Sequence, residues 1–283
     1  MSIENRIDSL TPLEMAEKVE TAGVRKASIP FWPLFSLSIL AGAYVALGAV
    51  FATTVATGAS SLPYGVVRLL MGLAFCLGLI LVVVGGAELF TGNSLLVMAW
   101  ASKKINLGAL LRNWSIVYLG NFVGSVLTAF LVFLAGQYTY GQGAVGGVAL
   151  NIAVSKIHPD ILQAVALGIL CNMLVCLAIW LTYSAKTVSG KILAIIFPIT
   201  AFVAAGFEHS VANMYFLPYA LMIKGFDPAF ATSSKVNLTS LTWSSSLLNN
   251  LLPVTLGNII GGAIFIGAMY WSIYLRKKES EIS

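Results

Sequence analysis

Residues 85–93 read GGAELFTGN, and residues 206–213 read GFEHSVAN. Each stretch places glycine and polar side chains inside a long apolar run, near 66–100 and 190–218. Non-helical backbone at membrane depth is tolerated only where protein or a water-filled cavity satisfies its polar groups. The two stretches therefore predict membrane-spanning helices that are broken near their middle.

The two stretches also match each other. Both follow the pattern G-x-E-x-x-x-x-N, with Gly86, Glu88 and Asn93 in one and Gly206, Glu208 and Asn213 in the other. The next apolar runs share a second pattern in constant register, in which Asn113, Val117, Leu119, Gly120, Asn121 and Gly124 correspond to Asn250, Val254, Leu256, Gly257, Asn258 and Gly261. We therefore predict two copies of a three-helix unit, about 33–136 and 161–275. An odd number of spans inverts one copy in the membrane, which is typical of transport proteins with paired broken helices. A duplicated bundle without a pathway is the alternative.

The composition agrees with a membrane protein. Hydrophobic residues make up 58% of the chain and charged residues 10%, whereas soluble proteins carry about 25% charged residues. A helical span needs about 20 apolar residues. The sequence therefore predicts an all-α membrane protein of six transmembrane helices, the second and fifth of them broken, near 33–56, 66–100, 113–136, 161–183, 190–218 and 247–275.

The polar segments suggest a domain plan and an orientation. Thr11-Pro12-Leu13-Glu14 is typical of a capping box, so we predict an amphipathic helix within a cytoplasmic segment 1–32. A transmembrane channel domain, 33–275, and a cytoplasmic tail, 276–283, would follow. Of the sixteen basic residues, twelve would lie on the side of the termini and four on the other, which places both termini in the cytoplasm of a multi-pass inner-membrane protein. The four are Arg68, Lys156, Lys224 and Lys235.

Glu88 and Glu208 are the acidic residues inside the predicted spans. An intramembrane carboxyl group can contact the solute directly. It can also accept hydrogen bonds from backbone N–H groups left open at a helix break. Their equivalence in the repeat, together with Asn93 and Asn213, favours a structural role performed twice, and both interpretations stay open.

His209 is the only histidine in a span and stands where the other copy has Leu89. It could be an ordinary core residue, but an imidazole can also donate hydrogen bonds to an anion and titrate near neutral pH. Thr91 supplies a hydroxyl group in the opposite break. Such a pair could hold a small monovalent anion weakly enough for release, which conduction requires. Large apolar side chains nearby could form constrictions or simply pack: Phe75, Leu79, Leu89, Phe90, Val175 and Phe202.

Several segments resemble one family along essentially the whole chain. They are MAEKVETAGVRKA (15–27), GAELFTGN (86–93), LGILCNMLVCLAIW (167–180), GFEHSVANM (206–214) and LGNIIGG (256–262). The sequence is similar to the formate/nitrite transporter family, and most similar to its bacterial formate channels.

The resemblance implies a homopentamer with one pore per subunit and an aquaporin-like protomer that passes formate. It assigns Leu79, Leu89 and Phe90 to a cytoplasmic hydrophobic slit, and Phe75, Val175 and Phe202 to a periplasmic one. It also implies a flexible-loop role for Thr91, a central role for His209, a polar partner near that histidine in Asn172, and in Lys156 a periplasmic lysine that attracts anions.

Other functions remain alternatives at this point. Gly92, Asn93 and Cys171 resemble nitrite channels as much as formate channels, so nitrite or hydrosulfide are alternative substrates. An aquaporin-type channel should carry two Asn-Pro-Ala motifs, and the chain has none. Two histidines, one of them in a loop, cannot provide bis-histidine haem ligation inside the membrane, and no phosphate-binding G-x-x-x-x-G-K-[ST] loop occurs. We therefore expect no enzyme activity, cofactor, metal or nucleic-acid partner, and a channel that is passive or pH-gated.

Overall fold

The computed structural model describes residues 9–276. Arg6, Lys277, Lys278 and all but the first residue of the predicted tail lie outside this part of the chain. No strand occurs among the described residues. The α-helices are α1 (Pro12–Ala27), α2 (Phe31–Ala56), α3 (Tyr64–Gly85), α4 (Val97–Ala101), α5 (Leu107–Leu134), α6 (Ala144–Ile157), α7 (Ile161–Ser184), α8 (Val188–Ala204), α9 (Ser210–Phe226), α10 (Pro228–Ser233), α11 (Trp243–Ser245), α12 (Leu252–Ile259) and α13 (Met269–Tyr274).

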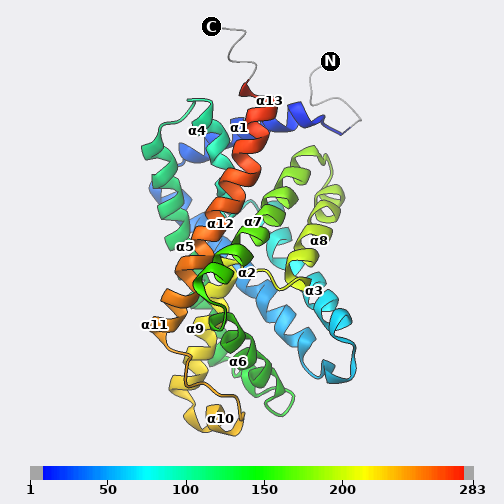
Figure 1. Cartoon of the computed structure of the whole chain (residues 1–283), viewed down its shortest axis with the longest axis vertical. Helices are drawn as coiled ribbons and strands as arrows, with labels where there is room; N and C mark the ends of the chain where they lie inside the picture. Colours follow the sequence, from blue (N-terminus) through cyan, green and yellow to red (C-terminus); the bar gives the residue numbers. More distant parts are fainter. Residues whose placement is uncertain (1–8, 277–283) are drawn as a thin grey trace.

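Short helices of other types join these elements. The 3₁₀ helices are η2 (Ala59–Ser61), η3 (Gly92–Leu96) and η4 (Gln137–Thr139), and the π-helices are η5 (Ser246–Leu251) and η6 (Ile260–Ala268). The segments α11, η5, α12, η6 and α13 follow one another without interruption and form one long helix. Helices α1 and α13 lie at one end of the molecule, and α10 and α11 lie toward the other (Figure 1).

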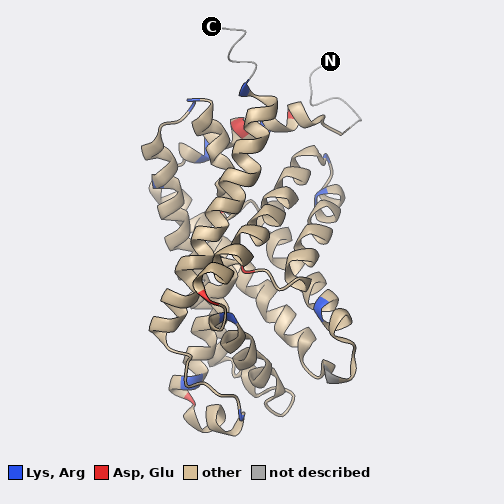
Figure 2. Cartoon of the chain, viewed as in Figure 1, with Lys and Arg blue, Asp and Glu red and all other residues tan. Residues whose placement is uncertain are grey.

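Five helices are long and apolar enough to cross a membrane, namely α2, α3, α5, α7 and Trp243–Tyr274. The predicted fifth span, 190–218, instead consists of α8 and α9, each of 17 residues. Helix α6, of 14 residues, was not predicted, because glycines surround it and its apolar stretch is too short for a span. The charged residues lie mainly toward the two ends of the molecule, and the long helices between them carry few (Figure 2).

Helix α1 has the predicted capping box. The Thr11 hydroxyl accepts from the Glu14 backbone N–H at 3.4 Å, and the Glu14 carboxylate accepts from the Thr11 N–H at 2.8 Å. The buried face of α1 packs against η3 and α4, and Glu20 forms an ion pair with Lys104. Helix α1 therefore packs beside the segment that follows the first break.

Each broken span ends its first half in the same way. Helix α3 is followed by Gly86 at φ 79°, and α8 is followed shortly by Gly206 at φ 78°. This left-handed conformation strains residues with a Cβ atom, so glycine is favoured at both positions. The chain then resumes as η3 and α4 after the first break and as α9 after the second.

The glycines of the second sequence pattern lie where helices cross. Helix α5 packs on α2, and α12 packs on α7. A Cβ atom on Gly124 would overlap the Ile39 carbonyl group, and one on Gly261 would overlap the Ile169 carbonyl group. Small residues allow such close helix approach in membranes. The matched glycines thus bring each asparagine-bearing helix against its neighbour.

We predict that Gly124→Val destabilises the protein by about 1–3 kcal/mol or more, because the new side chain forces α5 away from α2. Gly147→Val is the matched control, since a Cβ atom at this helical glycine meets nothing within 4 Å. Thermal unfolding of the purified protein in detergent measures both. Equal unfolding temperatures for the two variants would contradict the close-crossing interpretation.

Candidate functional site

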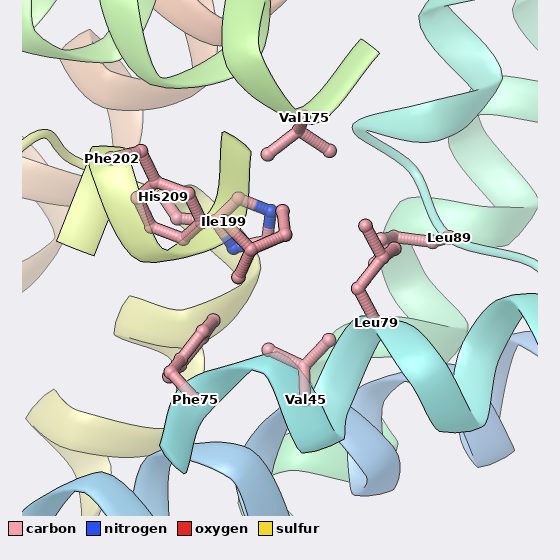
Figure 3. Close-up of a pocket in the computed structure, with 8 residues that line it drawn as sticks. All are labelled: Val45, Phe75, Leu79, Leu89, Val175, Ile199, Phe202 and His209. Carbon is pink, nitrogen blue, oxygen red and sulfur yellow. The ribbon is translucent and has the colours of Figure 1, made fainter. Parts of the chain in front are cut away.

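A narrow cavity lies between the two helix breaks. Its volume is ≈ 10 Å³, at the lower limit for one water molecule. Seven of its eight lining residues are apolar, and His209 is the exception (Figure 3). The aromatic rings lie at one side of the cavity and two leucines at the other (Figure 3). A solute larger than water can therefore pass only if side chains or the breaks move. The lining consists of Val45, Phe75, Leu79, Leu89, Val175, Ile199, Phe202 and His209.

The predicted constriction residues divide into two groups. Five of the six line the cavity, and the rings of Phe75 and Phe202 meet edge to face at 5.6 Å. Phe90 does not line this cavity, because its ring packs against Trp114 and Tyr118 with centroid distances of 6.3 and 4.9 Å. Val45 and Ile199 also line the cavity. Sequence reasoning missed them, because nothing distinguishes them from other apolar residues of their helices.

His209 is 3% exposed and forms the N-cap of α9. Its Nδ1 accepts a hydrogen bond from the Ala212 backbone N–H at 3.0 Å. A backbone N–H can only donate, so Nδ1 carries no proton and the hydrogen of the neutral ring lies on Nε2. The hydrogen-bonding pattern thus selects one tautomer and directs an N–H donor away from the helix.

Thr91 receives that donor. Its Oγ1 lies 3.0 Å from His209 Nε2, so the hydroxyl oxygen accepts and its own hydrogen stays available to donate. Thr91 is fully buried and does not itself line the cavity. The two breaks therefore meet through the two side chains that the sequence singled out, which stand 118 positions apart.

Asn172 contacts the backbone of Thr91. Its Nδ2 shares its two hydrogens among the Thr91 carbonyl at 3.2 Å, the Asn258 carbonyl at 2.6 Å and Ser94 Oγ at 3.1 Å. No hydrogen bond between Asn172 and His209 occurs in the described part of the protein. Asn172 therefore joins the first break to α12, and its relation to the histidine runs through Thr91.

A lysine forms an ion pair with the glutamate of the first break. Lys26 Nζ lies 3.0 Å from Glu88 Oε2 and 2.9 Å from Asn93 Oδ1. Asn93 Nδ2 donates to the same carboxylate at 2.8 Å. Lys26 comes from the end of α1, 62 positions before Glu88. Sequence reasoning missed this residue, although it belongs to the segment 15–27 that carried part of the family resemblance.

The second break has the same arrangement. Lys156 Nζ lies 3.0 and 3.2 Å from the two carboxylate oxygens of Glu208, and Asn213 Nδ2 donates to Glu208 at 2.6 Å. The Lys156 side chain is 13% exposed. It therefore forms a nearly buried ion pair with Glu208, and its role in attracting anions stays a prediction.

Glu88 and Glu208 lie at the breaks, but the expectation that they accept from the open backbone N–H groups needs a correction. Their carboxylates accept from lysine and asparagine side chains, and the open backbone groups are bound by two other residues. Asn121 donates to the Glu88 carbonyl at 3.0 Å and accepts from the Phe90 N–H at 2.9 Å. Asn258 does the same with the Glu208 carbonyl, at 3.0 Å, and the Ser210 N–H, at 2.9 Å. The repeat pattern already paired Asn121 with Asn258, which was the available signal.

Arg68 is a further cation beside the second break. Its Nε donates to the Ala204 carbonyl at 3.2 Å, and its Nη2 donates to the Val203 carbonyl. Both carbonyl groups belong to the last turn of α8, where a cation is favourable. Within residues 9–276, no group of three histidine, cysteine or acidic side chains could hold a metal ion.

We predict that Lys26→Met lowers the unfolding temperature, because the buried Glu88 carboxylate loses its cation. Removal of one partner of a buried pair costs about 3–5 kcal/mol, and the effect is smaller here since Lys26 is 23% exposed. The double variant Lys26→Met/Glu88→Gln should recover part of the loss. Lys191→Met is the control, because this partly exposed lysine of α8 has no ion pair among the described residues. Unfolding in detergent that is unchanged by Lys26→Met would refute the assignment.

Comparisons with known proteins agree with these features. The sequence profile of the formate/nitrite transporter family matches residues 13–272. The chain is 43% identical to the formate channel FocA of Escherichia coli strain K12 over 283 residues, 99% of each chain. It is 42% identical to FocA of Haemophilus influenzae over 263 residues, 92% of this chain and 93% of that protein. A solved pentameric formate channel with formate bound is 46% identical, with a TM-score of 0.82 over 87% of this chain and 98% of that chain. The chain belongs to the formate/nitrite transporter family.

Proposed function

We propose that the protein is a channel that moves formate, a small monovalent anion, across the cytoplasmic membrane. The observation that carries this proposal is the contact between His209 Nε2 and Thr91 Oγ1, at 3.0 Å beside an apolar cavity. When their mutual hydrogen bond opens, the neutral N–H and the hydroxyl can together donate to the two oxygens of a carboxylate. The relatives named FocA and the solved formate channel support formate as the solute.

We further infer the architecture in which this site works. The protomer has six transmembrane helices in two inverted repeats, about 33–136 and 161–275, with α8 and α9 as the fifth span. Equivalent Lys–Glu–Asn clusters at both breaks support the repeats. The N-terminal segment 1–32 and the tail 276–283 lie in the cytoplasm, as the distribution of basic residues favours. The solved pentamer supports a homopentamer with one aquaporin-like pore per subunit.

In this proposal, the cavity is the closed part of the pathway. An apolar constriction of ≈ 10 Å³ excludes a hydrated anion and gates by dewetting. The segment 85–93 is the candidate moving part, because residues 86–91, between α3 and η3, are not helical. Lys26 links this segment to α1, so a shift of α1 would change the gate. The proposed channel is passive or pH-gated.

The direct test is anion flux in proteoliposomes. We expect formate to pass faster than acetate and chloride, since the cavity is narrow and the donors of His209 and the neighbouring Thr91 suit a small two-oxygen anion. Nitrite shares that geometry, so nitrite and hydrosulfide belong in the same series. Nitrite or hydrosulfide flux above formate flux would favour the family's other substrates, and glycerol flux equal to formate flux would favour an aquaporin-type channel.

The second test separates the two roles of His209. Asparagine is a good N-cap, so His209→Asn should keep the start of α9 and lose the Nε2 donor. We expect an intact oligomer and a formate flux reduced about 10- to 100-fold, because a hydrogen bond to a charged group contributes about 1.5–3 kcal/mol.

Thr91→Val should give a reduction of the same order. Thr128→Val is the control, since this hydroxyl bonds only within α5, to the Gly124 carbonyl at 2.8 Å. Wild-type flux in both His209→Asn and Thr91→Val would remove this pair from the mechanism.

A further inference from the structure

We propose that a hydrogen bond between Tyr118 and Thr255 sets the separation of the two helix breaks and thereby positions His209 against Thr91. Tyr118 Oη lies 3.1 Å from Thr255 Oγ1. Both residues are half-buried, so the bond is partly shielded from solvent. This inference rests on the proposed function for its transport consequences, while its geometric content does not depend on the solute.

The bond joins equivalent positions of the two copies. In the register that pairs Asn113 with Asn250 and Asn121 with Asn258, Tyr118 corresponds to Thr255. Helix α5 packs mainly on α2 and α9, whereas α12 packs mainly on α7. The bridge therefore connects two helices whose main packing partners differ.

Each helix holds one break three residues beyond the bridge. On α5, Asn121 follows Tyr118 by three positions and accepts from the Phe90 N–H, next to Thr91. On α12, Asn258 follows Thr255 by three positions and accepts from the Ser210 N–H, next to His209. The bridge, the two asparagines and the Thr91–His209 contact thus form one closed ring of bonds. A change at the bridge must alter the opposite side of that ring.

The Tyr118 ring has a separate task. It meets the Phe90 ring edge to face at 4.9 Å, while Trp114 Nε1 donates to the Asn93 carbonyl at 2.9 Å. These contacts hold Phe90 against α5 and away from the cavity. Because ring and hydroxyl act on different partners, Tyr118→Phe removes the bridge and leaves the packing of Phe90.

A second connection limits the size of the effect. Asn172 also connects the first break to α12, the helix that holds the second break, through the Thr91 and Asn258 carbonyl groups. Loss of the bridge should therefore loosen the Thr91–His209 pair without separating the breaks. We expect a rise of about two- to tenfold in the formate concentration at half-maximal flux, the range for one net hydrogen bond. Discrimination between formate and the larger acetate should fall with it.

The experiment compares Tyr118→Phe, Thr255→Val and the double variant in proteoliposomes. The two single variants and the double variant should behave alike, because each removes the same bond and coupled residues are not additive. Tyr138→Phe is the matched control: the Tyr138 hydroxyl donates to Asp227 at 2.9 Å, which raises the pKa of Tyr138, and it lies outside the ring of bonds. Unchanged half-maximal concentration and selectivity, even with a lower unfolding temperature, would overturn the positioning role. Additive effects would overturn it as well.

A spectroscopic readout keeps the test independent of the solute. The chain has two histidines, so the ¹⁵N resonances of His209 can be assigned by comparison with His209→Asn. We expect Tyr118→Phe and Thr255→Val to shift His209 Nε2 in the direction that Thr91→Val shifts it, with His158 unchanged. No formate flux in the wild type would refute the proposed function alone. An Nε2 resonance that Thr91→Val shifts and both bridge variants leave in place would refute the bridge alone.

Discussion

The fold depends on the need to bind the backbone groups that two helix breaks expose inside an apolar environment. Neither water nor lipid can satisfy these groups there, so the protein must do so itself. Asn121 and Asn258 meet this need from neighbouring helices, each with both ends of its side-chain amide. Because each amide requires its helix to lie close by, the glycines that permit close crossing, such as Gly124 and Gly261, belong to the same design.

The charges at the breaks follow from the same constraint. Glu88 and Glu208 are nearly buried, and an unpaired buried carboxylate is very costly. Lys26 and Lys156 pair with them from outside the broken spans. At the centre, the polar groups that remain for a solute are those of a neutral imidazole and a hydroxyl. In the proposed channel, a site of this kind would bind an anion through hydrogen bonds without a fixed positive charge, which favours rapid release.

The structure also explains why the cavity between the breaks is narrow. The cavity between the breaks has room for about one water molecule, and its walls are almost entirely apolar. The side chains that close it stand on α2, α3, α7 and α8 and in the two breaks, so no single residue forms the barrier. In the proposed channel, opening requires a movement of the breaks relative to these helices.

The sequence by itself determined the all-helical membrane class, the two breaks, the family and the central pair of Thr91 and His209. The membrane class and the breaks depend on local hydropathy and equal spacings, which can be read along the chain, and the family follows from the resemblance of whole motifs. The inverted six-helix arrangement stays a prediction. Only the tertiary structure decided three contacts. Lys26 pairs with Glu88, Asn172 donates to Thr91 and not to His209, and Phe90 packs on α5 outside the cavity. Those contacts join segments far apart in the chain, and the direction of a side chain depends on how helices cross, which no spacing records.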